Sequence, residues 1–334
     1  MPQLTTGIVG CGLFGESHAT ALRGIPEVDI ASVFDLDQDR AHAFAQRFGI
    51  PKVAASLPEL LEESLDTVHV VTPESRHREA VVAALRSGKH VLVEKPFATN
   101  LEDCDAMAAA AKQSARILMV GHILRFDLRY GPLREEALSG TFGKVVSVSA
   151  RRNRARGGFS AYERVHPGIC NAIHDIDLTL SVVRSRVVRV RAFERKIYGK
   201  QNPDYFLGVI EFESGAVGTV ETSWLLPDAA GVSLDDFFQI IGEKATGTVA
   251  LQPAAVSIWS EQGYIAPDTG YETRLFGVAH GALQAELDYF YRCVRTGRQP
   301  EVVTTAEAKN AVRTALALIE SAHSKHDVEL FDWD

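Results

Sequence analysis

The sequence predicts an α/β protein in which an N-terminal doubly wound parallel sheet is followed by a domain with a large, mostly antiparallel open sheet. Over about the first 120 residues, short β-branched runs alternate with helical patterns, as in successive βαβ units. The strand runs are continuously apolar, which is typical of a sheet covered by helices on both faces. From about residue 143 the runs become longer and alternate between apolar and polar residues. We therefore expect a Rossmann domain over residues 1–122 and a second domain over residues 123–334.

Each element of the first domain follows from its own pattern. The apolar runs predict strands at residues 5–10, 28–35, 67–72, 90–95 and 116–121. Helical periodicity predicts helices from about Phe14 and over residues 37–48, 78–88 and 101–113. In the second domain, we expect long strands over residues 143–153, 187–197, 204–224 and 237–251, with Ser214 and Gly215 forming a hairpin turn. Two helices are expected near the end of the sequence, and the second opens with Thr304 and Glu307 at capping-box spacing. We expect this terminal helix to pack back on the first domain.

Composition excludes several classes of function. Of 334 residues, 46% are hydrophobic and 23% are charged, and the formal net charge is −8, so no basic surface for nucleic acid or an anionic membrane is expected. The four cysteines, Cys11, Cys104, Cys170 and Cys293, lack metal-site spacing, which predicts reduced thiols and no structural metal. The chain has neither a signal-peptide pattern nor a membrane-spanning run. We expect a cytoplasmic protein with no membrane or nucleic-acid partner.

A glycine fingerprint predicts a dinucleotide site. Gly10, Gly12 and Gly15 form G-x-G-x-x-G between a predicted strand and a predicted helix, the context in which a helix N-terminus binds a diphosphate. Leu13 and Phe14 lie inside this fingerprint and are included among the expected cofactor-binding residues. Asp35, twenty residues after Gly15, is placed to accept hydrogen bonds from the adenosine ribose. Its carboxylate disfavours a 2′-phosphate, so NAD is expected; Arg40 is the residue that could allow NADP.

The stretch "VLVEKPF" (residues 91–97) carries the candidate chemistry. Ligands of open α/β sheets bind beyond the carboxyl ends of the strands, where Glu94 and Lys95 are expected to lie. Pro96 fixes the backbone after them, and a cis Lys95–Pro96 bond would aim the lysine. We predict that Glu94 binds the cofactor and Lys95 faces the substrate.

These motifs resemble the Gfo/Idh/MocA oxidoreductases, named for glucose-fructose oxidoreductase and inositol dehydrogenase. The resemblance covers essentially the whole chain, and it is carried by "GIVGCGLFGESH", "TPESRH", "EKP", "GHILRF" and "IHDIDL". It implies hydride transfer between NAD or NADP and a hydroxyl carbon of a sugar, inositol, polyol or sugar acid. It also implies that Lys95 contacts the reacting oxygen, that Glu94 contacts the nicotinamide ribose, and that Thr72 and Pro73 line the cofactor with His77 nearby.

In the second domain, "HPGICNAIHDIDLTLSVV" predicts one helix starting near Pro167, with Cys170, His174 and Asp177 on one face. The resemblance implies that His174 is catalytic and that Asp177 binds substrate. Cys170 stands where many relatives have an aspartate, with Asn171 as the nearest polar substitute, and this raises the importance of Lys95. A Cys170–His174 metal pair lacks an obvious third ligand, so no metal is expected.

Further polar residues are candidates for substrate recognition. Arg125 and Tyr162 are expected to bind substrate, and His166 is a weaker candidate. The run Arg151, Arg152, Arg154 and Arg156 predicts either recognition of an acidic substrate group or a solvated or subunit-facing loop.

We therefore expect a nicotinamide-dependent dehydrogenase. Two alternatives remain open: a dinucleotide-sensing protein without catalysis, and an enzyme that uses tightly bound NAD for transient oxidation during elimination, hydrolysis or epimerisation. We also expect a homodimer or homotetramer built on the second sheet, because too few helices follow residue 143 to cover both of its faces.

Overall fold

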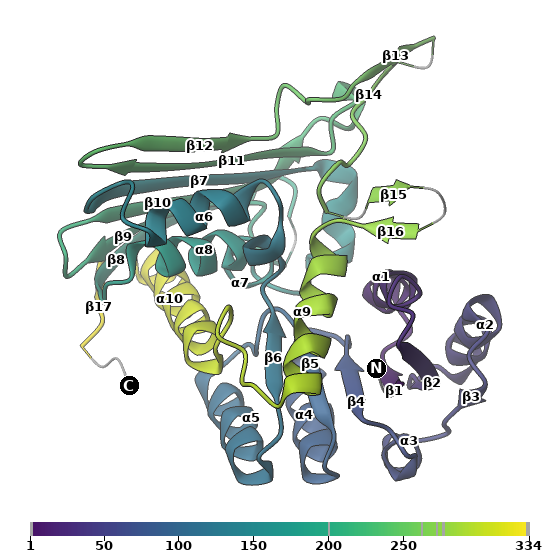
Figure 1. The fold of residues 1–334 in the computed structure, drawn as a ribbon. Coiled ribbons are helices and arrows are strands. Elements are labelled where there is room, and N and C mark those ends of the chain that lie inside the picture. The colour runs from purple at the N-terminus through teal and green to yellow at the C-terminus, as the bar shows by residue number, and fades with distance from the viewer. Residues whose placement is uncertain (1–2, 200, 262, 272, 276–277, 332–334) are drawn as a thin grey trace. The chain divides into compact units, whose positions relative to one another are not determined.

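The structure is a computed structural model that describes residues 3–199, 201–261, 263–271, 273–275 and 278–331. The chain divides into two compact units, which we call unit 1 (residues 1–127 and 270–309) and unit 2 (residues 128–269 and 310–334). Each unit is built around its own sheet (Figure 1).

Unit 1 contains a six-stranded parallel sheet with the order β3-β2-β1-β4-β5-β6. Its strands are β1 (Leu4–Val9), β2 (Val28–Phe34), β3 (Lys52–Val53), β4 (Thr67–Val70), β5 (His90–Glu94) and β6 (Leu118–Gly121). All four residues of β4 and four of the five in β5 are buried, as expected for strands covered on both faces. The order reverses at β1 and β4, so the predicted doubly wound sheet is confirmed.

Helices connect these strands and form the core with them. They are α1 (Leu13–Leu22), α2 (Gln38–Phe48), α3 (Leu57–Glu62), α4 (His77–Arg86) and α5 (Leu101–Ser114), with the 3₁₀ turns η1 (Glu74–Arg76) and η2 (Ile123–Phe126). Asp37, Ser56 and Asn100 cap α2, α3 and α5 by accepting a backbone N–H in the first turn. Local polar residues therefore fix where these helices begin.

The later segment of unit 1 returns to this core. It contains the hairpin β15 (Thr273–Leu275) and β16 (Val278–His280), followed by α9 (Ala282–Thr296). Leu283, Leu287, Phe290 and Tyr291 recur at helical spacing on α9 and are buried with residues of α1. The rings of Phe290 and Tyr291 also contact His69 of β4. The first residues of α10 (Thr305–Ser324) also belong to unit 1, and the predicted capping box is present: Glu307 N–H donates to Thr304 Oγ1 at 3.2 Å, while Thr304 N–H donates to Glu307 Oε2 at 3.0 Å.

Unit 2 contains a seven-stranded mixed sheet with the order β12-β11-β7-β10-β9-β8-β17. The strands are β7 (Val145–Ala155), β8 (Val187–Arg195), β9 (Tyr205–Phe212), β10 (Val217–Leu226), β11 (Leu234–Gly242), β12 (Thr246–Ala250) and β17 (Val328–Glu329). Every neighbouring pair is antiparallel except β7 and β10, which are parallel. Ser214 and Gly215 form the predicted turn between β9 and β10, with Gly215 at φ 86°. A small hairpin, β13 (Ile258–Ser260) and β14 (Gly263–Ile265), extends from unit 2.

Helices lie on one face of this sheet (Figure 1). They are α6 (Tyr130–Leu138), α7 (Pro167–Cys170), α8 (Ile173–Val183) and the part of α10 after residue 309; two 3₁₀ turns, η3 (Arg156–Ala161) and η4 (Asp228–Ala230), lie in the connections. Two strand glycines allow close approach, because a Cβ on Gly218 would lie 3.1 Å from Thr179 of α8 and one on Gly208 would lie 2.8 Å from Leu318 of α10.

The prediction of one continuous helix from Pro167 is wrong, because the helix breaks between α7 and α8. Ala172 N–H donates to Pro167 O, five residues back, instead of to Gly168 O. The Asn171 amide donates to Thr222 Oγ1 at 2.5 Å and to Arg152 O at 3.3 Å, which ties the break to β10 and β7. His174 and Asp177 consequently share α8, whereas Cys170 belongs to α7.

Candidate functional site

The glycine-rich turn between β1 and α1 has the geometry of a diphosphate cradle. Gly10 has φ 108°, and a Cβ there would lie 2.7 Å from Val71 O. A Cβ on Gly15 would lie 2.3 Å from Gly10 O, so the third glycine lets α1 start beside the turn. A Cβ on Gly12, in contrast, would have no atom within 4 Å. Gly12 is the N-cap of α1 and provides no side-chain acceptor, so backbone N–H groups at this open position can bind an anion.

Asp35 lies against this turn. Its carboxylate accepts the N–H of Cys11 at 2.8 Å and that of Asp37 at 2.9 Å, so both oxygens are held from the backbone. Arg40 Nη1 lies 3.5 Å from Asp35 Oδ1 and its Nη2 lies 2.9 Å from Asp37 Oδ2, with the arginine half exposed. Burial, and then the charge of Asp35, raise the pKa of the Cys11 thiol to about 12, which keeps that thiol protonated at neutral pH.

Lys95 lies beside the predicted cofactor-binding residues of α1. Its Nζ is 5.5 Å from the centre of the Phe14 ring, within cation–π range. Leu13, the first residue of α1, is 72% exposed. The Lys95–Pro96 peptide bond is cis. The structure thus brings Lys95, Phe14 and the glycine-rich turn together within unit 1.

Glu94 is buried at the end of β5 and both of its oxygens have partners. Oε2 accepts the backbone N–H of Lys95 at 3.1 Å, and Oε1 lies 3.1 Å from His18 Nε2. Burial alone would raise the pKa of Glu94, but the hydrogen bond from His18 and the nearby charge of Lys95 hold this pKa below its usual value. Glu94 is therefore an ionised carboxylate at neutral pH.

His77 joins the two loops that follow β4 and β5. Its Nδ1 lies 3.1 Å from Pro96 O and 3.3 Å from Phe97 O, and its Nε2 lies 3.0 Å from Thr72 O. Burial lowers the pKa of His77, although the backbone carbonyls oppose this effect. Pro73 precedes the turn η1 that leads into α4. His77 is thus placed to hold the Thr72–Pro73 and Lys95–Pro96 segments together.

Arg125 is also buried within unit 1. It lies in η2, donates from Nη1 to Val302 O at 2.5 Å and forms an ion pair with Glu307 at 3.1 Å. Glu307 is the residue of the capping box, so Arg125 is tied to the start of α10.

The second-domain candidates lie in unit 2. His174 and Asp177 are buried on the first turns of α8, three residues apart and therefore on neighbouring positions of one face. Asn171 is buried and bonded to β7 and β10 as described above. Tyr162 stacks on Trp224, with 5.1 Å between the ring centres, and Cys170 Sγ donates to Val165 O at 3.8 Å.

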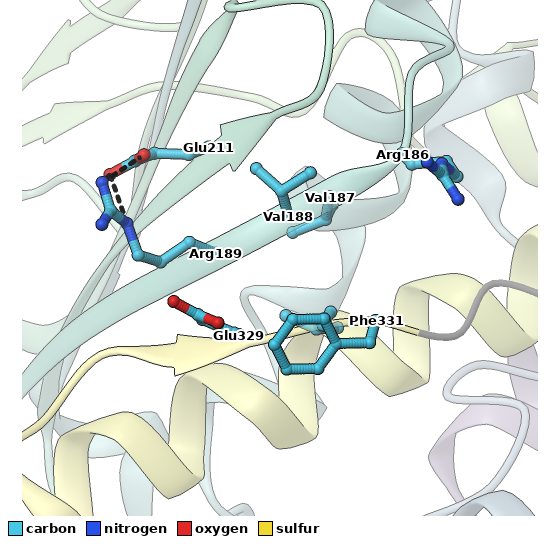
Figure 2. Close-up of a pocket in the computed structure, with 8 residues that line it drawn as sticks. Arg186, Val187, Val188, Arg189, Glu211, Glu329 and Phe331 are labelled. Carbon is cyan, nitrogen blue, oxygen red and sulfur yellow. Dashed lines mark hydrogen bonds and ion pairs between the residues drawn. The ribbon is translucent and has the colours of Figure 1, made fainter.

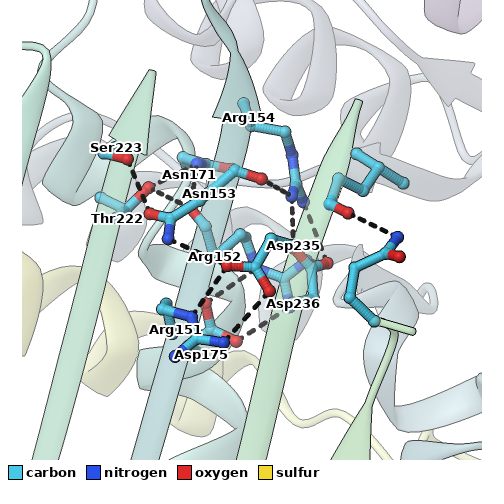
Figure 3. Close-up of polar contacts among 12 residues, drawn as sticks. Arg151, Arg152, Asn153, Arg154, Asn171, Asp175, Thr222, Ser223, Asp235 and Asp236 are labelled. Carbon is cyan, nitrogen blue, oxygen red and sulfur yellow. Dashed lines mark hydrogen bonds and ion pairs between the residues drawn. The ribbon is translucent and has the colours of Figure 1, made fainter. Parts of the chain in front are cut away.

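The arginine run is engaged within unit 2 (Figure 3). Arg152 binds Asp175 and Asp236, Arg154 binds Asp236, and Arg151 binds Asp235. Arg156 lies 4.0 Å from the centre of the Tyr198 ring. The sequence expectation of a substrate-facing or solvated arginine loop missed Asp175 and Asp236 as buried partners, since nothing in the local sequence marks them.

Among the described residues, His166, Glu194 and His323 form the group whose ligand atoms lie close enough to hold a metal ion. His166 Nδ1 accepts the N–H of Gly168 at 3.0 Å, which leaves the proton of the neutral ring on Nε2, 3.0 Å from Glu194. A protonated Nε2 cannot bind a metal, so this group is better explained as a hydrogen-bonded cap of α7. Figure 2 shows a separate pocket at the β8–β17 edge, where Arg189 pairs with Glu211 at 2.8 Å.

Comparison with known proteins places the chain in a class and then in a family. A model described as an oxidoreductase family with an NAD-binding Rossmann fold matches residues 4–122, and its C-terminal alpha/beta domain matches residues 135–330. With the glycine-rich turn and Glu94–Lys95 in place, these matches define an NAD-dependent oxidoreductase. The chain belongs to the Gfo/Idh/MocA oxidoreductase family.

Individual relatives span nearly the whole chain. The scyllo-inositol 2-dehydrogenase (NAD⁺) of Bacillus subtilis is 30% identical, covering 98% of this chain and 96% of its own. The myo-inositol 2-dehydrogenase of Thermotoga maritima is 28% identical, covering 97% and 98%. A solved structure described as a probable dehydrogenase from Thermotoga maritima is 26% identical, covers 98% of this chain and 99% of that one, and superposes with a TM-score of 0.84. Within the described part of the chain, every helix is too short or too polar to span a lipid bilayer.

Proposed function

We propose that this protein is an NAD⁺-dependent dehydrogenase that oxidises a secondary hydroxyl of an inositol or a closely related polyol. The observation that carries this proposal is the ionised Glu94 beside Lys95 at the carboxyl end of β5, next to the diphosphate cradle. The full-length match to two relatives named inositol 2-dehydrogenases supports the substrate class.

Several residues fit the cofactor. Backbone N–H groups at Gly12 and the start of α1 would hold the diphosphate, and Asp35 would accept hydrogen bonds from the adenosine ribose. Thr72, Pro73 and the ring of Phe14 would line the nicotinamide end, with Glu94 on its ribose. When bound, NAD⁺ supplies a hydride acceptor. The Asp35 carboxylate would repel a 2′-phosphate on the adenosine ribose, so it favours NAD over NADP. Arg40, which lies 3.5 Å from Asp35, is the cation that could bind such a phosphate.

The protein's own residues must manage a proton. As hydride leaves carbon, the hydroxyl proton must pass to an acceptor within about 3 Å. We assign Lys95 to orient the hydroxyl and stabilise the developing negative charge on oxygen, and His174 to share the proton transfer. For hydroxyl recognition we propose Asp177, with Asn171, Arg125 and Tyr162 as further candidates. In the single chain the Asn171 amide is bonded to Thr222, and Arg125 is bonded to Val302 O and Glu307. Position 170 carries a cysteine on α7, so it offers no carboxylate to hold His174. This supports giving Lys95 the larger part in catalysis.

We further propose that two copies associate through the face of the unit 2 sheet opposite α6 and α8. Cross-strand register aligns Ile241, Ser147 and Val217 in one row of this face. A second row aligns Phe237, Arg151, Glu221, Leu207 and Phe193. Val217, Ile241 and Phe193 remain 37–44% exposed in the single chain. A two-fold interface uses the same patch on both copies, and these rows combine exposed apolar residues with charges of both signs, so a second copy is the partner that we propose. A cytoplasmic location also remains a proposal, supported by four free cysteines.

The test of the substrate proposal is a panel of inositols, sugars, polyols and sugar acids, with NAD⁺ and with NADP⁺, followed at the reduced-nicotinamide absorbance band. We expect net NADH release with an inositol. Binding of NADH without turnover of any compound would favour the dinucleotide-sensing alternative. Conversion of a substrate without net NADH release would favour transient oxidation by tightly bound NAD.

A further inference from the structure

A continuous row of buried side chains leads from Glu94 into the interior of unit 1. His18 Nε2 lies 3.1 Å from Glu94 Oε1, and His18 Nδ1 lies 2.9 Å from His69 Nδ1. His69 Nε2 lies 2.8 Å from the hydroxyl of Tyr291, which lies 3.3 Å from Thr67 Oγ1. His18, His69 and Tyr291 are each fully buried. They come from α1, β4 and α9, and the cofactor and substrate roles assigned above use none of them.

The donor and acceptor roles along this row follow from its carboxylate end. An ionised carboxylate only accepts, so His18 Nε2 must carry the proton that points to Glu94. A neutral imidazole has one N–H, so His18 Nδ1 must accept and His69 Nδ1 must donate to it. His69 Nε2 then accepts from the Tyr291 hydroxyl, whose oxygen can accept from Thr67. Every ring nitrogen is satisfied with all hydrogen bonds running toward Glu94.

The reversed arrangement would require a positive charge on His18. If His18 carried both protons, its Nδ1–H would donate to His69, and His69 would donate to Tyr291. Such a cation would sit in a region without solvent, packed against the His69 ring at 5.2 Å between ring centres. Burial also holds the pKa of His69 well below its usual value, so the second ring stays neutral. The neutral row is the arrangement that the packing favours.

We propose that His18 is a positioning residue for Glu94, and that His69 and Tyr291 act through it by fixing its tautomer. The His18 N–H holds Oε1, while the backbone N–H of Lys95 holds Oε2, so one carboxylate links α1 to the backbone of the proposed catalytic lysine. The row therefore keeps Glu94 ionised and in one orientation. This inference rests on the proposed function, in which Glu94 contacts the nicotinamide ribose.

Substitution of His18 tests this role in the intact protein. His18→Gln keeps an N–H donor near the Nε2 position, whereas His18→Phe removes both ring nitrogens. We expect His18→Phe to weaken NADH binding, measured by fluorescence titration, by about 10-fold or more, by analogy with the lower end of the loss when a residue that orients a metal ligand is replaced. His18→Gln should recover most of this loss. Equal loss in both variants, or none in His18→Phe, would overturn the proposal.

A matched pair of tyrosine variants tests the far end of the row. Tyr291→Phe removes the hydroxyl that donates to His69, and it should weaken NADH binding measurably. Tyr289→Phe is the control on the same helix, because its hydroxyl accepts from Glu301 N–H at 2.8 Å and Val302 N–H at 3.1 Å, outside the row. NADH binding should be unchanged in the control. Equal effects of the two substitutions would overturn the role of Tyr291.

Tautomers can be read without any assay of activity. In protein labelled with ¹⁵N-histidine, nitrogen chemical shifts distinguish Nδ1–H from Nε2–H, and the variants His18→Gln and His69→Asn assign the two rings. We expect Nε2–H for His18 and Nδ1–H for His69 at neutral pH. Any other state of either ring overturns the inference, whether or not the protein turns over a polyol. If the tautomers are as expected but no polyol is turned over, the hydrogen-bonded row is supported and the proposed function is refuted.

Discussion

Arg152 of β7 and Asp175 of α8 form two parallel hydrogen bonds, from Nε to Oδ2 and from Nη2 to Oδ1, both 2.8 Å long. Both side chains are almost fully buried, and Arg152 also binds Asp236 of β11 at 2.7 Å. Asp175 directly follows His174 in the chain. The pair therefore fixes the first turn of α8, which carries His174 and Asp177, against the unit 2 sheet.

Removing one partner of the Arg152–Asp175 pair should strongly destabilise the folded protein. Asp175→Ala leaves the Arg152 charge buried with fewer acceptors, so we expect the free energy of unfolding to fall by about 3–5 kcal/mol. Asp235→Ala is the matched control, because Asp235 pairs with Arg151, whose side chain is 42% exposed, and such pairs contribute about 1 kcal/mol or less. Urea unfolding of both variants measures the difference. Similar losses of unfolding free energy in the two variants would show that the buried pair stabilises the fold no more than the exposed pair does.

Cofactor choice should depend on Asp35. The Asp35 carboxylate is anchored by the N–H groups of Cys11 and Asp37, so a 2′-phosphate there would meet a fixed negative charge. We expect NADH to bind more tightly than NADPH and Asp35→Ala to narrow the difference. Fluorescence titration with both cofactors measures this, with Asp39→Ala as an acidic control on the first turn of α2. Wild-type protein that prefers NADPH would contradict the assignment.

Stability should fall in mild acid. Burial lowers the pKa of His69, His77 and His166 in the folded protein, whereas unfolded histidine titrates near 6.5. Below about pH 6.5 the unfolded chain therefore binds more protons than the folded one, and stability is lost as pH falls. Each such histidine contributes up to about 1.4 kcal/mol per pH unit until its folded pKa is reached. Urea unfolding at pH 7.5 and 5.5 should show this loss, and His69→Asn should reduce it. Equal stability at both pH values would refute the prediction.

Self-association of the protein should depend on the face of the unit 2 sheet opposite α6 and α8. Light scattering at micromolar concentration should give a dimer or tetramer. Val217→Asp, at the start of β10 on that face, should shift the protein toward monomer, because a charge would replace an apolar contact. Ile197→Asp is the control, since Ile197 is exposed beyond the end of β8. A wild-type protein that is only monomeric would contradict the proposal.

Features set by neighbouring residues could be predicted from the sequence. The glycine-rich turn, the Ser214–Gly215 hairpin and the Thr304–Glu307 capping box each depend on residues a few positions apart. The break before α8 could not be predicted, because it depends on the bond between Asn171 and Thr222, 51 residues later.

The buried polar groups were missed for the same reason. His18 and His69 are 51 residues apart, and His69 and Tyr291 are 222 residues apart. Their sequence signal was limited to polar residues within otherwise apolar patterns, such as His69 in "TVHVVT". That signal marks a buried polar group, but its partner is determined only by tertiary packing.

The rate of inositol oxidation by the Lys95→Ala variant tests the central claim most directly. With NAD⁺ and the best inositol of the panel, we expect kcat to fall at least about 100-fold, the lower scale for general acid–base catalysis, and to fall further than in His174→Ala. NADH affinity should be nearly unchanged, because the amide of residue 95 still binds Glu94. Near-wild-type turnover by Lys95→Ala would contradict the account of Glu94 and Lys95 as the reactive end of this sheet.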